Sequence, residues 1–317
     1  MIKKIGRNLV KRFRRFQMPG HLIKNQIRID RTQAAKIEES LKATFFQGWR
    51  SEGSFSDKTF MADLKAHLLE RLESDRFLYI PWLDKNIRLR GANILEIGCG
   101  TGSSTVALAE QGANVTAVDI EEEALAVARE RCKIYNLQVN FIHGNASEIS
   151  DVVKDQKFDL VIFFACMEHM TYQERILCLK QFYDLLPAGG FLSIVDTPNR
   201  LWYVDEHTSW LPFFHWLPDN LAFDYTRYSP REFLNQYYHE YSEDMLLHFL
   251  RRGRGFSYHE IEIALNIRAS QFQGVNYLKR YFLPFSLDRK YHKFLIKMNP
   301  GINKGFFYPK IDIMIKK

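Results

Sequence analysis

Three glycines at alternating positions follow a short apolar run and precede helix-forming residues in the segment ILEIGCGTGSSTVAL at 94–108. A glycine loop between a strand and a helix lets a ligand approach the backbone closely, so Gly98, Gly100 and Gly102 are candidate cofactor-binding residues. Asp119 ends the next apolar run, about twenty residues past the loop, where a carboxylate accepts hydrogen bonds from ribose hydroxyls. Together these features predict a site for an adenosine-containing cofactor, and several cofactor classes share them.

The residues around the loop exclude two phosphate-binding motifs. A P-loop places a Lys followed by Ser or Thr after its last glycine, whereas Ser103, Ser104 and Thr105 follow Gly102. A dinucleotide fingerprint has the spacing GxGxxG, and Ser103 occupies the position of its third glycine. Glu96 lies just before the loop, where its negative charge repels a pyrophosphate and attracts an ammonium group. The loop therefore favours a nucleoside that bears an amino acid.

Strands and helices alternate around this loop. Strands are predicted at 93–97, 114–119, 138–143, 158–164 and 190–196, and helices at 103–111, 121–135 and 171–185. Such alternation implies right-handed parallel crossovers and a sheet covered by helices on both faces. Two later runs, 256–264 and 310–316, alternate apolar and polar residues, which predicts an antiparallel edge pair.

Four motifs in this order resemble those of the class I methyltransferases that use S-adenosylmethionine (SAM), especially the branch around the ubiquinone-biosynthesis O-methyltransferases. They are LEIGCGTG at 95–102, VTAVD at 115–119, FDLV with a terminal EH at 158–169, and LLPAGGFLSIV at 185–195. The resemblance covers about residues 90–200. It implies an α/β fold with a Rossmann-like seven-stranded sheet, five strands parallel plus an antiparallel edge pair, and helices on both faces. An N-terminal helical extension and an aromatic lid insertion complete the expected architecture.

The resemblance also implies how SAM is bound. The three glycines would approach its methionine part, with Glu96 near the ammonium group, Asp119 on the ribose hydroxyls and Ile120 beside the adenine. A tight turn alone is the alternative interpretation of the glycines.

Three further cofactor contacts follow from the same resemblance. Asn145 and Ala146 occupy the place of an Asp-Ala pair that meets the adenine edge. Phe164 would border the sulfonium, with a plain core aromatic as the alternative.

Methyl transfer from a sulfonium is an in-line displacement, for which the protein mainly aligns the reacting atoms. A base is needed when the acceptor is a hydroxyl of high pKa. Candidates are expected beyond the carboxyl ends of the strands, in loops after 164 and 196. The segment DTPNRLWYVDEHTSWLPFFHWLP at 196–218 combines acids and histidines with aromatic residues, which predicts a lid over a sugar or ring. A plain aromatic cap over the core is the alternative.

Within these loops His207 is the predicted base, with Asp205 or Asp196 to orient it. Glu168 and His169 form a second candidate pair. A divalent metal held by Asp196, Glu168 and His207 is a further hypothesis, which spacing alone does not decide.

The net charge of +7 comes from residues 1–16, which contain seven cations and no acid, so the remainder of the chain is balanced. A general nucleic-acid surface is therefore not indicated. At helical spacing the apolar residues of 1–16 share one side, as in helices that bind an anionic membrane surface. Packing on the protein itself or on a partner, and a transit peptide, are the alternatives. The expected domains are this basic helix at 1–20, a helical cap at 21–80, and a methyltransferase domain at 81–317 with insertions at 197–255 and 265–305.

These observations predict a cytoplasmic enzyme, peripheral to the inner membrane face if the basic helix binds lipid. No apolar run is long enough to span a bilayer, and the four cysteines lack metal-ligand spacing, which indicates buried free thiols. We expect O-methylation of a glycan or lipid-linked intermediate. The alternatives are O-methylation of a prenylated quinone precursor, an NAD-dependent oxidoreductase, and a non-catalytic SAM-binding adaptor.

Overall fold

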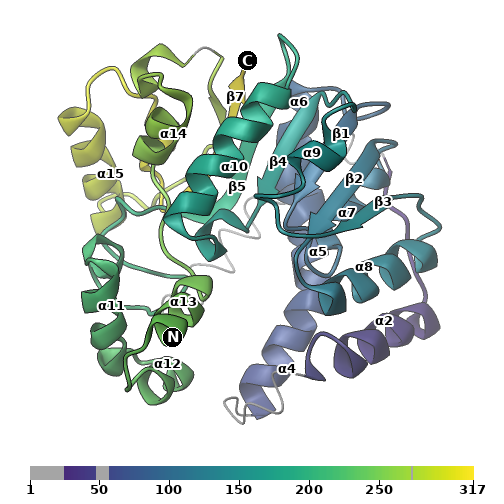
Figure 1. Cartoon of the computed structure of the whole chain (residues 1–317), viewed down its shortest axis with the longest axis horizontal. Helices are drawn as coiled ribbons and strands as arrows, with labels where there is room; N and C mark the ends of the chain where they lie inside the picture. Colours follow the sequence, from purple (N-terminus) through teal and green to yellow (C-terminus); the bar gives the residue numbers. More distant parts are fainter. Residues whose placement is uncertain (1–24, 48–56, 273) are drawn as a thin grey trace.

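A seven-stranded sheet forms the centre of the computed structural model, which describes residues 25–47, 57–272 and 274–317 (Figure 1). The strand order is β3-β2-β1-β4-β5-β7-β6. Strands β1 to β5 run parallel, and β7 pairs antiparallel with β5 and with β6. This arrangement confirms the predicted α/β sheet. The strands are β1 (Asn93–Ile97), β2 (Asn114–Asp119), β3 (Asn140–His143), β4 (Leu160–Phe164), β5 (Phe191–Pro198), β6 (Asn276–Tyr277) and β7 (Lys310–Lys316).

Helices between the parallel strands cover both faces of the sheet, as the alternating pattern predicts. Successive side chains of a strand point to opposite faces, so Ile94 packs in one apolar layer and Leu95 in the other. Every residue of β4, in the middle of the sheet, is buried. The crossover helices are α7 (Ser103–Ala109), α8 (Glu122–Ile134), α9 (Ser150–Val153) and α10 (Tyr172–Leu185).

One edge strand was predicted in the wrong place. Residues 256–264 contribute to a helix, α14 (Tyr258–Leu265), that packs on α10, and the edge strand is the two-residue β6. The helix begins with a capping box, in which Ser257 and Glu260 each satisfy the other's backbone N–H. This start signal outweighs the alternation of polar and apolar residues that predicted a strand.

The helix before β1 contains two wide π-helical turns. It runs from Asp57 to Asn86, with π-helical turns at η2 and η3. Pro81 lacks the N–H that an α-helix would pair one turn earlier, and the wide turn η3 ends just before it. The segments are α4 (Asp57–Lys65), η2 (Ala66–Glu70), α5 (Arg71–Ser74), η3 (Asp75–Tyr79) and α6 (Ile80–Asn86), and α2 (Arg31–Ala43) precedes them.

The insertion after β5 folds around a small apolar core of its own. Phe214, Phe223 and Phe249 are fully buried within it and pack edge to face. Figure 1 shows its helices on one side of the molecule and α2 and α4 on the other. They are α11 (Asp219–Tyr225), α12 (Glu232–Tyr237) and α13 (Glu243–Arg251).

The remaining elements are one long helix and several 3-10 turns. They are α15 (Leu287–Met298), η4 (Met167–His169), η5 (Phe214–Trp216), η6 (Thr226–Tyr228), η7 (Ala269–Gln271) and η8 (Lys304–Phe307). None of the helices in the described ranges has the length and apolarity that a bilayer crossing requires. The basic helix predicted at 1–16 lies outside the described residues.

Candidate functional site

The three loop glycines have different structural reasons to be glycine. All have positive φ, at +75° for Gly98, +51° for Gly100 and +80° for Gly102. A Cβ on Gly98 would lie 2.3 Å from the Cβ of Cys166, and one on Gly102 would lie 2.9 Å from the Cα of Ala128. A Cβ on Gly100 would meet no atom within 4 Å. Packing therefore requires the outer two glycines, and the middle one leaves open space beside the backbone.

Asp119 lies at the carboxyl end of β2 and is bonded to the loop. Its Oδ2 accepts from the backbone N–H of Gly100 at 2.7 Å, and its Oδ1 accepts from that of Glu121 at 3.0 Å. Burial raises the pKa of this carboxyl group, which the backbone N–H groups partly offset. Ile120, the next residue, is half exposed. The two residues lie side by side at the edge of the loop.

Glu96 is fully buried beneath the loop. The hydroxyls of Ser104 and Thr105, in the first turn of α7, donate to its two carboxylate oxygens, Thr105 at 2.6 Å. Burial raises the pKa of Glu96 to about 7. In this structure Glu96 anchors α7 to β1, and its contact with a ligand ammonium group stays a prediction.

The three other predicted cofactor residues lie at the ends of β3 and β4. Asn145 closes its own turn, because its Oδ1 accepts from the N–H of Ser147 at 3.1 Å. Ala146 is buried. Phe164, the last residue of β4, packs edge to face with Tyr79 at a centroid distance of 5.1 Å.

A second cluster lies past the end of β4, where Glu168, His169 and His207 each place a ligand atom within 4.8 Å of the others. Glu168 is fully buried, and its Oε1 has no hydrogen-bond partner among the described residues. His207 Nε2 lies 3.7 Å from this oxygen, which is too long for a hydrogen bond. An unpaired buried carboxylate oxygen is costly, so this atom is a candidate contact for a ligand.

The hydrogen bonds around both imidazoles indicate which ring nitrogen carries the proton. Thr208 Oγ1 donates to the carbonyl of Gly253 at 2.8 Å and so accepts from Nδ1 of His207 at 3.0 Å. His169 Nδ1 donates to the carbonyl of Arg251 at 2.7 Å. In the neutral rings Nε2 is then an acceptor. Glu168 Oε1 and His207 Nε2 therefore face each other as two acceptors without a donor between them.

Burial shifts the pKa values of this pair in opposite directions. It raises the pKa of Glu168 and lowers that of His207 to about 3. The imidazole is therefore neutral at physiological pH.

Asp205 and Asp196, the predicted orienters of His207, contact other groups. Asp205 Oδ1 accepts from the backbone N–H of His207 at 2.8 Å, and its Oδ2 accepts from that of Ser209 at 2.5 Å. Asp205 thus positions His207 through its backbone, while Thr208 contacts the ring. Asp196, with φ +57°, accepts from the Tyr79 hydroxyl at 2.8 Å and from the Lys310 ammonium group.

Comparison with known proteins agrees with this geometry: residues 94–190, from β1 to the residue before β5, match the family described as "Methyltransferase domain". The chain carries a class I SAM-dependent methyltransferase domain. The ubiquinone biosynthesis O-methyltransferase of Coxiella burnetii is 32% identical over 122 residues, which are 38% of this chain and 50% of the relative. The protein of that name from Pseudomonas putida is 27% identical over 170 residues, 53% of this chain and 64% of the relative.

The sequence likeness covers only part of the chain. The chain spans about half the length of the curated relatives it matches. Magnesium protoporphyrin IX methyltransferase of Synechocystis PCC 6803 aligns with 90% of this chain and 100% of its own, at 15% identity and a TM-score of 0.48.

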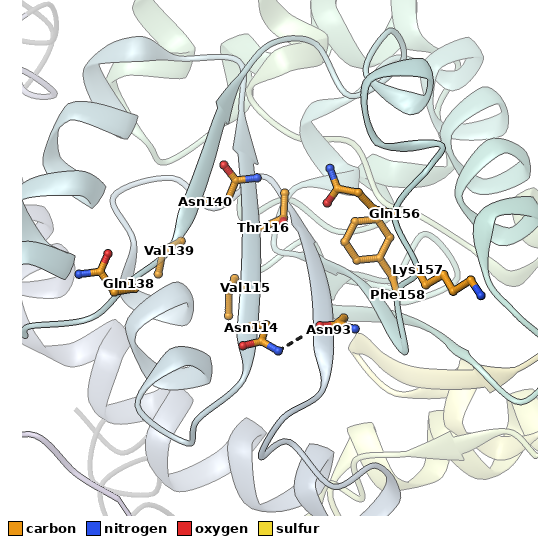
Figure 2. Close-up of a pocket in the computed structure, with 10 residues that line it drawn as sticks. All are labelled: Asn93, Asn114, Val115, Thr116, Gln138, Val139, Asn140, Gln156, Lys157 and Phe158. Carbon is orange, nitrogen blue, oxygen red and sulfur yellow. Dashed lines mark hydrogen bonds between the residues drawn. The ribbon is translucent and has the colours of Figure 1, made fainter.

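The loop of the methyltransferase domain fits the cofactor that its class implies. SAM needs room at the backbone of a glycine and an acceptor for its ribose hydroxyls, and the open side of Gly100 lies next to Asp119. A cavity of ≈650 Å³ lies at the opposite, amino-terminal edge of β1 to β3, and half of its lining residues carry amide side chains, such as Asn93 and Asn114 (Figure 2). Because ligands of open α/β sheets bind at the carboxyl edge, this cavity is not the cofactor site.

The sequence motifs did not reveal two residues that hold the glycine loop in place, His67 and Arg131. His67, in the wide turn η2, pairs through Nδ1 with Thr101 Oγ1 of the glycine loop at 3.0 Å. Buried Arg131 donates to the carbonyls of Thr101 and His67, both at 2.8 Å. No motif marks either residue, since their roles depend on how the N-terminal helix packs against α7 and α8.

Proposed function

We propose that this chain transfers the methyl group of SAM to a hydroxyl of a glycan or lipid-linked acceptor. The observation that carries the proposal is the pair of acceptor atoms, Glu168 Oε1 and His207 Nε2, that face each other across 3.7 Å without a donor. An acceptor hydroxyl placed between them would donate to one of these atoms and lose its proton as the methyl group arrives.

In this proposal the hydroxyl donates its single hydrogen to Glu168, which takes the proton, and the neutral ring of His207 borders the same acceptor position. Burial makes the carboxylate more basic and the imidazole less basic than usual, so the proton moves to Glu168 Oε1. Thr208 and Asp205 hold His207 in place through its ring and its backbone. This assignment exchanges the roles expected from the sequence, where His207 was the base and Glu168 belonged to a second pair.

SAM supplies an activated methyl group, and the proposed binding residues align it. Gly100 and Asp119 would hold the methionine and ribose parts, with Ile120, Asn145 and Ala146 around the adenine. Glu96 would act near the ammonium group and Phe164 near the sulfonium.

The acceptor class rests on the lid segment. Trp210, Phe213 and Trp216 are each about half exposed, and aromatic faces stack well on sugar rings. A prenylated quinone precursor is the second candidate, because the relatives that the methyltransferase domain matches are named for ubiquinone biosynthesis.

Labelled methyl transfer from SAM into a lipid-linked glycan fraction, compared with a prenylated phenol, tests the acceptor class. We expect label in the glycan fraction; label in the phenol alone contradicts the acceptor class. If no fraction leads to formation of S-adenosylhomocysteine, the non-catalytic SAM-binding adaptor is favoured. If calorimetry shows that the chain binds NAD more tightly than SAM, the NAD-dependent oxidoreductase is favoured.

Substitutions test the two roles. Glu168→Gln should lower kcat by roughly a hundredfold or more and remove the rise in rate as pH increases through the pKa of Glu168. His207→Ala should lower kcat less and keep that rise, and His239→Ala, at an exposed position of the insertion between α12 and α13, is the matched control. A Glu168→Gln chain with the wild-type pH profile contradicts the assignment. Loss of activity on chelation, restored by a divalent cation, would instead place a metal ion between the three acceptor atoms.

A further inference from the structure

Helix α15 and the loop before it carry an exposed apolar stripe. Six large apolar side chains are at least half exposed, and Phe285 reaches 89%. Within α15 three of them lie at i, i+7 and i+11, which places them on one side of the helix. The six are Tyr281, Leu283, Phe285, Leu287, Phe294 and Met298. Exposed apolar side chains gathered on one helix face and the loop before it are typical of an interaction site.

The fold holds Phe285 in solvent at an energetic cost. Its φ of +64° is unfavourable for a bulky side chain, and its exposure shows that packing does not compensate for it. The loop itself is anchored, because Phe282 turns inward and stacks on Trp202 at 5.9 Å, and Ser286 caps α15 by accepting from the N–H of Arg289. The outward position of Phe285 is thus a fixed feature.

Cations flank the apolar stripe. Arg289, Lys290, Lys293 and Lys297 are all exposed on α15. The one acid of the helix, Asp288, accepts from the Tyr203 hydroxyl at 2.6 Å and is therefore engaged with the protein. The outer face of α15 combines apolar side chains with an uncompensated positive charge.

We propose that loop 281–287 and α15 dock the chain on an anionic lipid bilayer, with Phe285 inserted among the acyl chains. Lysines beside exposed aromatic and aliphatic side chains fit the boundary between charged headgroups and hydrocarbon. Residues 1–16 are an unsuitable cover for this face, because their seven cations repel its lysines. A second copy of α15 is disfavoured by the same repulsion.

This surface is mechanically connected to the lid. Tyr203 bonds to Asp288, and the Tyr291 hydroxyl of α15 donates to the carbonyl of Leu201 at 3.0 Å. Residues 201–203 lead directly to Asp205 and His207. The docking proposal does not depend on methyl transfer, so its test can fail or succeed independently of the proposed function.

Vesicle sedimentation of the full chain tests the proposal. We expect binding to phosphatidylcholine vesicles that contain phosphatidylglycerol and much weaker binding to phosphatidylcholine alone. Phe285→Ser should weaken the former about tenfold, and Lys290→Gln, Lys293→Gln and Lys297→Gln about fivefold each. Val152→Ser and Lys133→Gln, exposed positions far along the chain on α9 and α8, are controls that should bind like wild type. If a variant that combines the three lysine substitutions binds anionic vesicles like wild type, or if the wild-type chain does not prefer the anionic lipid, the proposal is overturned.

A fluorescent label at the tip of the loop gives a direct readout of insertion. The four native cysteines are buried and free, so Phe285→Cys offers the accessible thiol among the described residues. An environment-sensitive dye there should brighten and shift to shorter wavelength with anionic vesicles, and the same dye on Val152→Cys should not. An unchanged signal at position 285 while the chain is vesicle-bound shows that another segment docks and overturns the proposal.

Discussion

At the scale of single residues, the two halves of the candidate site were predictable to different degrees. Gly98, Gly100, Gly102 and Asp119 stand in a local motif whose geometry follows from the strand-loop-helix sequence, and the structure joins Gly100 to Asp119 directly. The Glu168–His207 pair spans 39 residues and two loops, so the sequence predicted different acid–base roles for its members and grouped them only in the hypothetical metal site with Asp196. Only the tertiary structure brings the two acceptor atoms within 3.7 Å.

The buried carboxyl of Glu96 gives a testable dependence of stability on pH. Its pKa is raised from 4.5 to about 7 in the folded chain, so between these values the folded state holds a proton that the unfolded state has lost. Stability from this group therefore falls as pH rises through that window, by about 1.4 kcal/mol per pH unit at most.

Glu96→Gln removes this titration. The free energy of unfolding of the variant, relative to wild type, should increase from pH 4.5 to 7 and stay constant above, as measured by urea titration at each pH. Parallel curves for variant and wild type across that range would contradict the assignment.

At the scale of elements, capping signals and strand length explain what the sequence pattern predicted and what it did not. The parallel strands β1 and β2 begin and end where predicted, because each is a buried apolar run followed by a turn. The prediction of a strand at 256–264 was wrong. The alternation of polar and apolar residues there does not exclude a helix, and the Ser257–Glu260 capping box marks the start of one. A two-residue strand such as β6 has no periodicity to detect.

The glycine loop allows a prediction that separates folding from cofactor binding. Gly98→Ala and Gly102→Ala should destabilise the chain by roughly 2 kcal/mol or more, because the added Cβ collides with Cys166 or Ala128. Gly100→Ala has free space and should cost about 1 kcal/mol, from its positive φ alone. It should nevertheless reduce SAM affinity in calorimetry. A Gly100→Ala chain that binds SAM like wild type would show that the open space beside the loop is not the cofactor position.

At the scale of the whole molecule, one buried arginine connects the lid insertion to the sheet layer. Arg175, on α10, donates to the carbonyls of Glu168, Arg254 and Gly255 and pairs with Glu260 at 3.0 Å. It thus joins the end of the insertion, α14 and the turn that carries Glu168.

Arg175→Met should lower the free energy of unfolding by about 3 kcal/mol, since it removes the guanidinium that donates to the buried carbonyls of Arg254 and Gly255 and pairs with Glu260 Oε2. Arg129→Met, which breaks an exposed pair with Glu122, should change stability by less than about 1 kcal/mol. Chemical denaturation compares the two variants, and equal effects would contradict a structural role for Arg175.

The two wide turns in the helix before β1 have a consequence for insertions and deletions in related sequences. A π turn holds an extra residue, so a chain one residue shorter at 66–70 can still form a continuous helix. Its two halves would keep nearly the same relative orientation, because a π turn absorbs one more residue than the α turn that replaces it, and the α4 face that buries Leu64 would still face the core. A one-residue gap in this stretch is thus compatible with the same fold, and its exact position decides whether a related chain has a counterpart of His67.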